Sequence, residues 1–154
     1  MKNDKVIDLL DDLLTRITDS AKGYTEAGNG VRYVQLRKLF FDYAEQRESM
    51  QEQLQTLITK YGGEREEDPS GSFLGGAHRV WLEFQAQINE HQAEDVLEEC
   101  VRGEERALED YDQVLEDYNL PADVHAVIEN QRNAIDAAKK QMLKLEAQYD
   151  VIED

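Results

Sequence analysis

Apolar residues recur along most of the chain at alternating intervals of four and three positions, which places them on one face of an α-helix. Four long segments keep this spacing, and we expect long helices over about residues 3–27, 31–61, 92–118 and 121–149. Glycine and asparagine follow the first segment at Gly28-Asn29-Gly30, as is typical of helix C-termini. The first two segments and the last two are each joined by a short turn. This arrangement predicts two antiparallel helical hairpins.

The crossover, residues 62–91, joins the second and third long segments and is richer in glycine than its surroundings. An apolar repeat returns within it and ends near Asn89, and Ser70 or Ser72 would cap the start of a shorter helix there. At ~1.5 Å per residue, this helix would carry the chain back along most of a bundle, so that the second and third long helices run parallel. We therefore predict an all-α fold, a ferritin-like up-down-down-up four-helix bundle with an additional shorter helix in the crossover between the second and third long helices. Residues 1–154 would form this single domain.

Polar residues interrupt the apolar stripes at four positions. They are Ser20, Arg47, Glu104 and Gln131. If the second and third long helices run parallel, Arg47 and Glu104 fall at nearly the same level. Because an unpaired buried charge costs several kcal/mol, we expect a buried Arg47–Glu104 ion pair that is hydrogen-bonded to Tyr43 or Tyr111. The alternative is that Arg47 extends along a loosely packed edge and reaches solvent.

Five short motifs stand out along the chain. They are Gly23-Tyr24-Thr25-Glu26-Ala27, Gln46-Arg47, Ser70-Gly71-Ser72 with Gly75, His78-Arg79-Val80-Trp81, and Gly103-Glu104-Glu105 with Ala107 and Tyr111. Together they resemble a bacterial ferritin-like four-helix-bundle family known as domain of unknown function 2383, and the resemblance covers about residues 4–149. The resemblance implies the fold and implies no activity. Members of the family often carry a histidine late in the last helix, where this chain has Asp136-Ala137-Ala138-Lys139.

A di-iron centre in a ferritin-like bundle uses a glutamate from each of two helices and a Glu-x-x-His motif from each of the other two. No Glu-x-x-His occurs in this sequence, and among the stripe residues only Glu104 would serve as a ligand. Glu26 lies opposite the buried stripe of its helix and is expected to face water. Arg47 would repel a cation bound beside Glu104. We therefore expect no cofactor. The alternative is iron or manganese held by atypical ligands, Glu104 with His78 or Tyr24.

The chain carries 34 acidic and 17 basic residues, for a net charge of −17. This charge argues against nucleic acid and against anionic membrane surfaces as partners. Cys100 is the only cysteine, which excludes an internal disulfide and fits a reducing compartment. No signal peptide or membrane-spanning segment is visible in the sequence, so we expect a cytoplasmic protein.

Two functional hypotheses follow from these patterns. The first is a non-catalytic binding or association module without a standard di-iron centre, with an unknown protein partner and a possible homo-oligomeric state. It follows from a core in which Arg47, tyrosines and aliphatic residues fill the positions of metal ligands. The second is a metal-binding redox or storage protein of the ferritin-like superfamily with atypical ligands. Elemental analysis distinguishes them.

Overall fold

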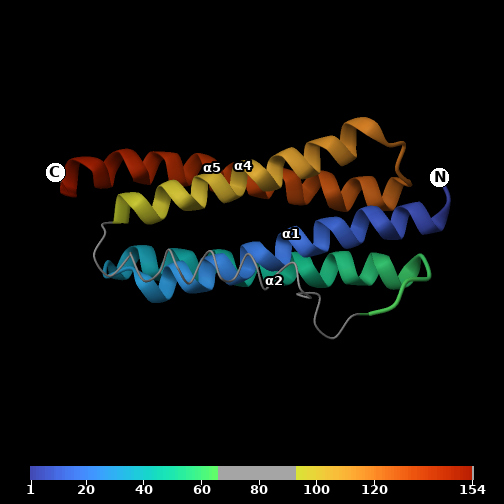
Figure 1. The fold of residues 1–154 in the computed structure, drawn as a ribbon, viewed down its shortest axis with the longest axis horizontal. Helices are drawn as coiled ribbons and strands as arrows, with labels where there is room; N and C mark the ends of the chain where they lie inside the picture. Colours follow the sequence, from blue (N-terminus) through green and yellow to red (C-terminus); the bar gives the residue numbers. More distant parts are fainter. Residues whose placement is uncertain (66–92, 154) are drawn as a thin grey trace.

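The computed structural model describes residues 1–65 and 93–153. Within these residues the chain forms four α-helices and no strands (Figure 1). They are α1 (Asn3–Gly30), α2 (Val34–Lys60), α4 (Ala93–Asp117) and α5 (Ala122–Glu153). The prediction of an all-α helical bundle is confirmed. The predicted crossover helix, with Ser70, Ser72 and His78, lies outside the described residues.

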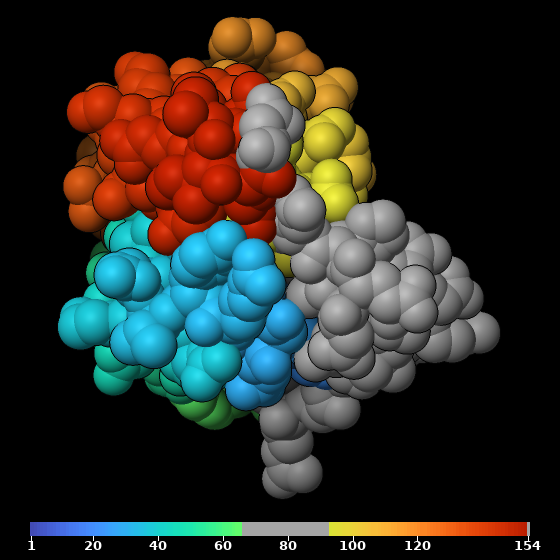
Figure 2. All heavy atoms as spheres, turned by 90° about the vertical axis from the view of Figure 1, so that its left-hand side faces the viewer, coloured from blue at the N-terminus to red at the C-terminus, as the bar shows by residue number. Residues whose placement is uncertain are grey.

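The four helices form two hairpins that lie side by side. Helix α1 packs along α2, and α4 packs along α5, while α1 also contacts α4 and α2 also contacts α5. In Figure 1, α1 and α5 run in one direction and α2 and α4 in the other, so each of these four packed pairs is antiparallel. Figure 2 shows the same division end-on, with α1 and α2 in one block and α4 and α5 in the other. None of the described helices has an apolar stretch that is long enough to cross a bilayer.

Helix α1 runs three residues past its predicted end at residue 27 and includes Gly28. A Cβ atom at Gly28 would lie 2.7 Å from the ring of Phe41, so the glycine lets α2 approach α1 closely. Helix α5 also continues beyond its predicted end at residue 149 and reaches Glu153. The helix therefore extends about four residues further than the sequence pattern predicts, and the contacts of Glu153 described below explain why.

Two separate apolar cores fill the bundle. On α2, Phe40 belongs to one core and Leu54 belongs to the other. Arg47 lies between these two residues along the helix, and Glu104 holds the same intermediate position on α4. The bundle therefore contains a polar layer at mid-length with a packed apolar core on each side.

Candidate functional site at the centre of the bundle

The polar layer is centred on an ion pair between α2 and α4, which belong to different hairpins. Arg47 Nη1 donates to Glu104 Oε1 at 2.7 Å, and Arg47 Nη2 donates to Glu104 Oε2 at 2.6 Å. The pair is shielded from solvent, since Arg47 is 0% and Glu104 is 2% exposed. Two parallel hydrogen bonds between a planar guanidinium and a carboxylate form the strongest kind of side-chain pairing. The geometry therefore compensates both buried charges.

The remaining surface of the guanidinium is also occupied. Arg47 Nη1 donates to Ser20 Oγ at 2.8 Å, and Arg47 Nε donates to Gln46 Oε1 at 3.2 Å. The ring of Tyr24 lies against the guanidinium, with its centroid 5.3 Å from Cζ, which is within the range of a cation–π contact. Ser20 and Tyr24 are four residues apart on α1, so one face of that helix supplies both contacts.

The hydroxyl of Tyr24 is buried beside the ion pair. Burial raises its pKa well above the usual value, and the nearby Glu104 carboxylate raises it further. Within the described residues the hydroxyl has no partner at ordinary hydrogen-bond geometry. Its ring packs on those of Tyr43 at 5.2 Å and Phe40 at 6.1 Å between centroids. Tyr24 therefore stays protonated, and its ring contacts the guanidinium of Arg47 and two neighbouring aromatic rings.

The predicted hydrogen bonds from Tyr43 or Tyr111 to the ion pair are wrong. The Tyr43 hydroxyl donates to Gln141 Oε1 on α5. The Tyr111 hydroxyl donates to Gln131 Oε1 at 2.6 Å. The backbone of Tyr111 is about 10 Å along α4 from that of Glu104, since the two are seven residues apart at ~1.5 Å per residue. Both tyrosines thus link helices next to the ion pair, and Ser20 supplies the hydroxyl that contacts it.

Gln131 is at the centre of a second buried hydrogen-bond network, which lies next to the ion pair along the bundle. Besides accepting from Tyr111, its Nε2 donates to the Met50 carbonyl oxygen at 3.2 Å and to Gln53 Oε1 at 2.9 Å. Gln131 and Tyr111 are both buried. This network joins α2, α4 and α5 and satisfies the polar groups that it buries.

The prediction that Glu26 faces water is also wrong, since this side chain is only 8% exposed. Near its C-terminus α1 is buried on more than one stripe, because Gly23, Tyr24, Ala27 and Gly28 are buried as well. An argument from one apolar stripe fails where a helix is covered on several sides.

The residues of the polar layer do not fit a di-iron centre. Both carboxylate oxygens of Glu104 accept hydrogen bonds from Arg47, and a guanidinium is a cation with no lone pair to offer a metal. Ser20 and protonated Tyr24 complete the layer, and neither is a carboxylate or an imidazole. In the described part of the chain, no three residues among His, Cys, Asp and Glu are grouped so that they would hold a metal. His78 lies outside the described residues.

Cys100 lies one helical turn from Glu104 and is buried. Burial and the Glu104 carboxylate raise the pKa of its thiol well above the usual value. A thiol is a weak nucleophile until it loses its proton. Cys100 therefore fills space in the core.

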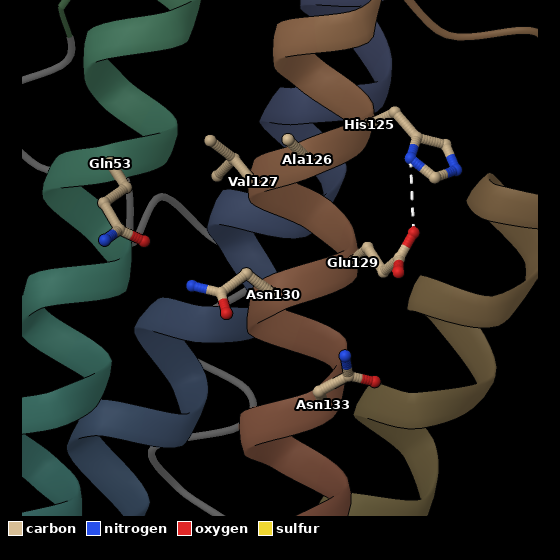
Figure 3. A pocket seen from close by; sticks show the side chains of 7 residues that line it. All are labelled: Gln53, His125, Ala126, Val127, Glu129, Asn130 and Asn133. Atoms are coloured by element: carbon tan, nitrogen blue, oxygen red, sulfur yellow. Dashed lines mark ion pairs between the residues drawn. The ribbon is translucent and has the colours of Figure 1, made fainter.

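A hollow of about 610 Å³ lies on the surface beside α5 (Figure 3). Gln53 borders it from α2, and the other described residues of its lining come from α5. Figure 3 shows His125 and Glu129 on the side of α5 that faces away from Gln53. Their ion pair, 3.3 Å from Nδ1 to Oε2, joins two exposed side chains four residues apart. Among the residues that the structure describes, the hollow gathers no convergent chemical groups.

Comparison of the sequence with models of protein families found a match. Residues 5–117 match the model of a family described as Domain of unknown function (DUF2383). The match covers α1, α2 and α4, and so includes Ser20, Tyr24, Arg47 and Glu104. A search of the curated proteins found no match.

Proposed function

The chain belongs to the family Domain of unknown function (DUF2383), and we propose that it is a non-catalytic helical bundle that acts through binding or association. The proposed architecture is ferritin-like and up-down-down-up, with a shorter helix in the crossover at residues 62–91. In this proposal residues 1–154 form one domain, and the protein works in the cytoplasm.

The observation that carries the proposal is the closed pairing of Arg47 with Glu104. Bundles that use carboxylate-bridged metals place inward-facing carboxylates and histidines in the core. Here the buried carboxylate at mid-length is taken by a guanidinium, which brings its own positive charge. Among the described residues, the layer joins the two hairpins and offers neither an open coordination position nor an activated nucleophile, which supports the proposal.

We propose that the protein acts through its surface. The net charge of the chain, −17, disfavours binding to nucleic acid and to anionic membranes. The proposed partners are therefore proteins, including a second copy of the chain. Sedimentation velocity over a wide concentration range tests the homo-oligomer. A sedimentation coefficient that does not change with concentration would exclude weak self-association.

Elemental analysis tests the proposal against its main alternative, an iron or manganese protein with Glu104, His78 or Tyr24 as ligands. The protein is purified without chelators, and its metal content is measured for wild type and for Glu104→Gln, which keeps the size of the side chain. We expect far less than one metal ion per chain in both. Stoichiometric iron or manganese in wild type that is lost in the variant would refute the proposed function.

A further inference from the structure

Two large apolar side chains are exposed on one stripe of α2. Phe41 packs on α1, where a Cβ atom at Gly28 would lie 2.7 Å from its ring, and yet Phe41 is 37% exposed. Val34, seven residues earlier on the same helix, is 72% exposed. Residues seven apart share one face of an α-helix. This stripe therefore presents apolar surface to solvent over about two helical turns.

Four exposed charged residues flank Phe41 in a regular order. At ~100° per residue, Lys38 and Glu45 lie about 60° and 40° to one side of Phe41 around the helix. Arg37 and Glu48 lie about 40° and 20° to the other side of Phe41. On each flank, therefore, a basic residue precedes Phe41 and an acidic residue follows it.

This order makes the stripe complementary to itself. If two copies of α2 lay antiparallel with a two-fold axis at Phe41, each flank would face the same flank of the other copy in reverse order. At ~1.5 Å per residue, Lys38 would lie about 1.5 Å along the helix axis from Glu45 of the other copy. Arg37 would lie about 4.5 Å along the axis from Glu48 of the other copy. Each of these opposite-charge contacts would occur twice.

The distribution of charge also favours α2 as a contact between identical chains. The net charge of the chain is −17, so two copies repel each other over most of their surface. Helix α2 has seven exposed charged side chains, three basic and four acidic, whereas α4 contains eleven acidic and two basic residues among its 25. Two copies would therefore approach each other with little repulsion through α2.

The existing contacts of the two basic residues are compatible with this pairing. Lys38 Nζ lies 3.0 Å from Asp42 Oδ2, and the two side chains are 78% and 56% exposed. Exposed ion pairs contribute little to stability, so Lys38 can exchange one carboxylate for another. Arg37 Nη2 donates to the Val31 carbonyl oxygen at 2.9 Å. A guanidinium has five N–H donors, which leaves others for a second carboxylate.

We propose that α2 forms the contact between two copies of the chain, in an antiparallel two-fold dimer centred on Phe41. This inference deepens and rests on the proposed role as an association module. The two Phe41 rings and Val34 would supply the apolar contact, and the charged flanks would fix direction and register. A contact made by one helix of each copy is smaller than a standard stable interface, so the dimer is a weak one.

Two charge-reversal variants test this pairing by sedimentation velocity over a wide concentration range. Arg37→Glu with Lys38→Glu makes both flanks acidic, and Glu45→Lys with Glu48→Lys makes both flanks basic. Each variant would bring like charges together, so we expect each to raise the dimer dissociation constant about tenfold or more. When the two variants are mixed, their flanks carry opposite charges, and association should return to within about threefold of wild type.

The matched control is Lys140→Glu with Lys144→Glu, which makes the same change in net charge as the acidic variant at exposed positions of α5. We expect this control to change the dissociation constant by less than about twofold. In wild type, the amide chemical shifts of Lys38, Phe41 and Glu45 should change as the protein concentration rises.

Three results would overturn the inference. They are a wild-type chain that stays monomeric at the highest concentration, equal effects of the acidic variant and its α5 control, and a mixture of the two reversed variants that does not associate. None of these results alters the metal content of the core, which tests the proposed function. The inference and the proposed function can therefore fail separately.

Discussion

Arg47 and Glu104 lie on helices from different hairpins and meet through two hydrogen bonds of 2.7 and 2.6 Å. Each residue separates two apolar cores along its own helix. The pair thus fixes the level at which one hairpin packs against the other, because a shift of one turn would separate two charges in a dry interior.

A double-mutant cycle on this pair should show strong coupling. We expect Arg47→Met and Glu104→Leu each to lower the free energy of unfolding by ~3–5 kcal/mol, because each leaves one buried charge without a partner. The double variant should lose much less than the sum, since it buries no charge. Urea denaturation of the four proteins measures the coupling.

The Arg16–Asp110 pair provides the control for this cycle. Its side chains are 27% and 38% exposed, and its 2.7 Å contact also joins α1 to α4. We expect a coupling of no more than ~1 kcal/mol there. Equal coupling at the two pairs would contradict the view that burial makes the central pair important.

Removing the Tyr111 hydroxyl should destabilise the protein more than the same change at Tyr43. Tyr111→Phe leaves the buried Oε1 of Gln131 without its 2.6 Å donor, and we expect a loss of ~1–2 kcal/mol in the free energy of unfolding. Tyr43 donates to the exposed Gln141, whose oxygen can turn to water, so Tyr43→Phe should cost less than ~0.5 kcal/mol. Thermal and urea denaturation measure the stability of the two variants. If Tyr43→Phe lost more stability than Tyr111→Phe, the Gln131 network would add little to the stability of the fold.

The side chain of Glu153 should protect the start of α4 from exchange with solvent. Its Oε1 and Oε2 accept the backbone N–H groups of Glu94 and Ala93, both at 3.0 Å, and Oε2 also accepts from the Tyr33 hydroxyl at 3.1 Å. A carboxylate at this position stabilises the N-terminal end of a helix by about 1 kcal/mol. In Glu153→Ala, the Ala93 and Glu94 amides should therefore exchange hydrogen about fivefold faster or more.

The matched control is Asp150→Ala, which removes an exposed carboxylate one turn earlier on α5. Hydrogen–deuterium exchange should show little change at Ala93 and Glu94 in that variant. Unchanged exchange at both amides in Glu153→Ala would mean that the tail does not hold the start of α4.

Asp19 should make the stability of the protein fall as pH rises through the mildly acidic range. Partial burial raises its pKa from 3.8 to about 6, although Arg16, Lys22 and Arg106 act in the opposite direction. Between these two values the folded state keeps a proton that the unfolded state releases, so this carboxyl lowers stability as pH increases. Asp19→Asn removes that term and should gain stability relative to wild type between pH 4 and pH 7.

Urea denaturation at several pH values checks this expectation. Asp8→Asn removes the same charge from an exposed position of α1 and corrects for the change in net charge. If the stability difference between Asp19→Asn and wild type stays constant across the range after this correction, Asp19 does not titrate as described.

The spacing of apolar residues predicted the four described helices, because a buried stripe is a local property of the sequence. It also drew attention to Arg47 and Glu104, since a charge in an apolar stripe is visible without coordinates. The hydroxyl partners escaped prediction for a physical reason. A stripe gives the level and face of a residue, whereas the choice between Gln131 and the ion pair depends on how α4 and α5 rotate against each other.

Two further features depended on distant parts of the chain. The sequence pattern ended the last helix at about residue 149, because nothing near Glu153 in sequence signals a contact and its partners Ala93 and Glu94 are about 60 residues away. Glu26 looked exposed because the stripe of α1 accounts for only one covered side. Long-range contacts of this kind leave no periodic trace in a single sequence.

The division of the central charges between hairpins has a consequence for assembly. The α1–α2 hairpin contributes only the arginine, and the α4–α5 hairpin contributes only the glutamate. If two copies of one hairpin came together during synthesis or refolding, two guanidinium groups or two carboxylates would face each other in the shared interior. Such mispaired species would be disfavoured, because each would bury two like charges. The opposite charges of Arg47 and Glu104 therefore favour the pairing of the two different hairpins.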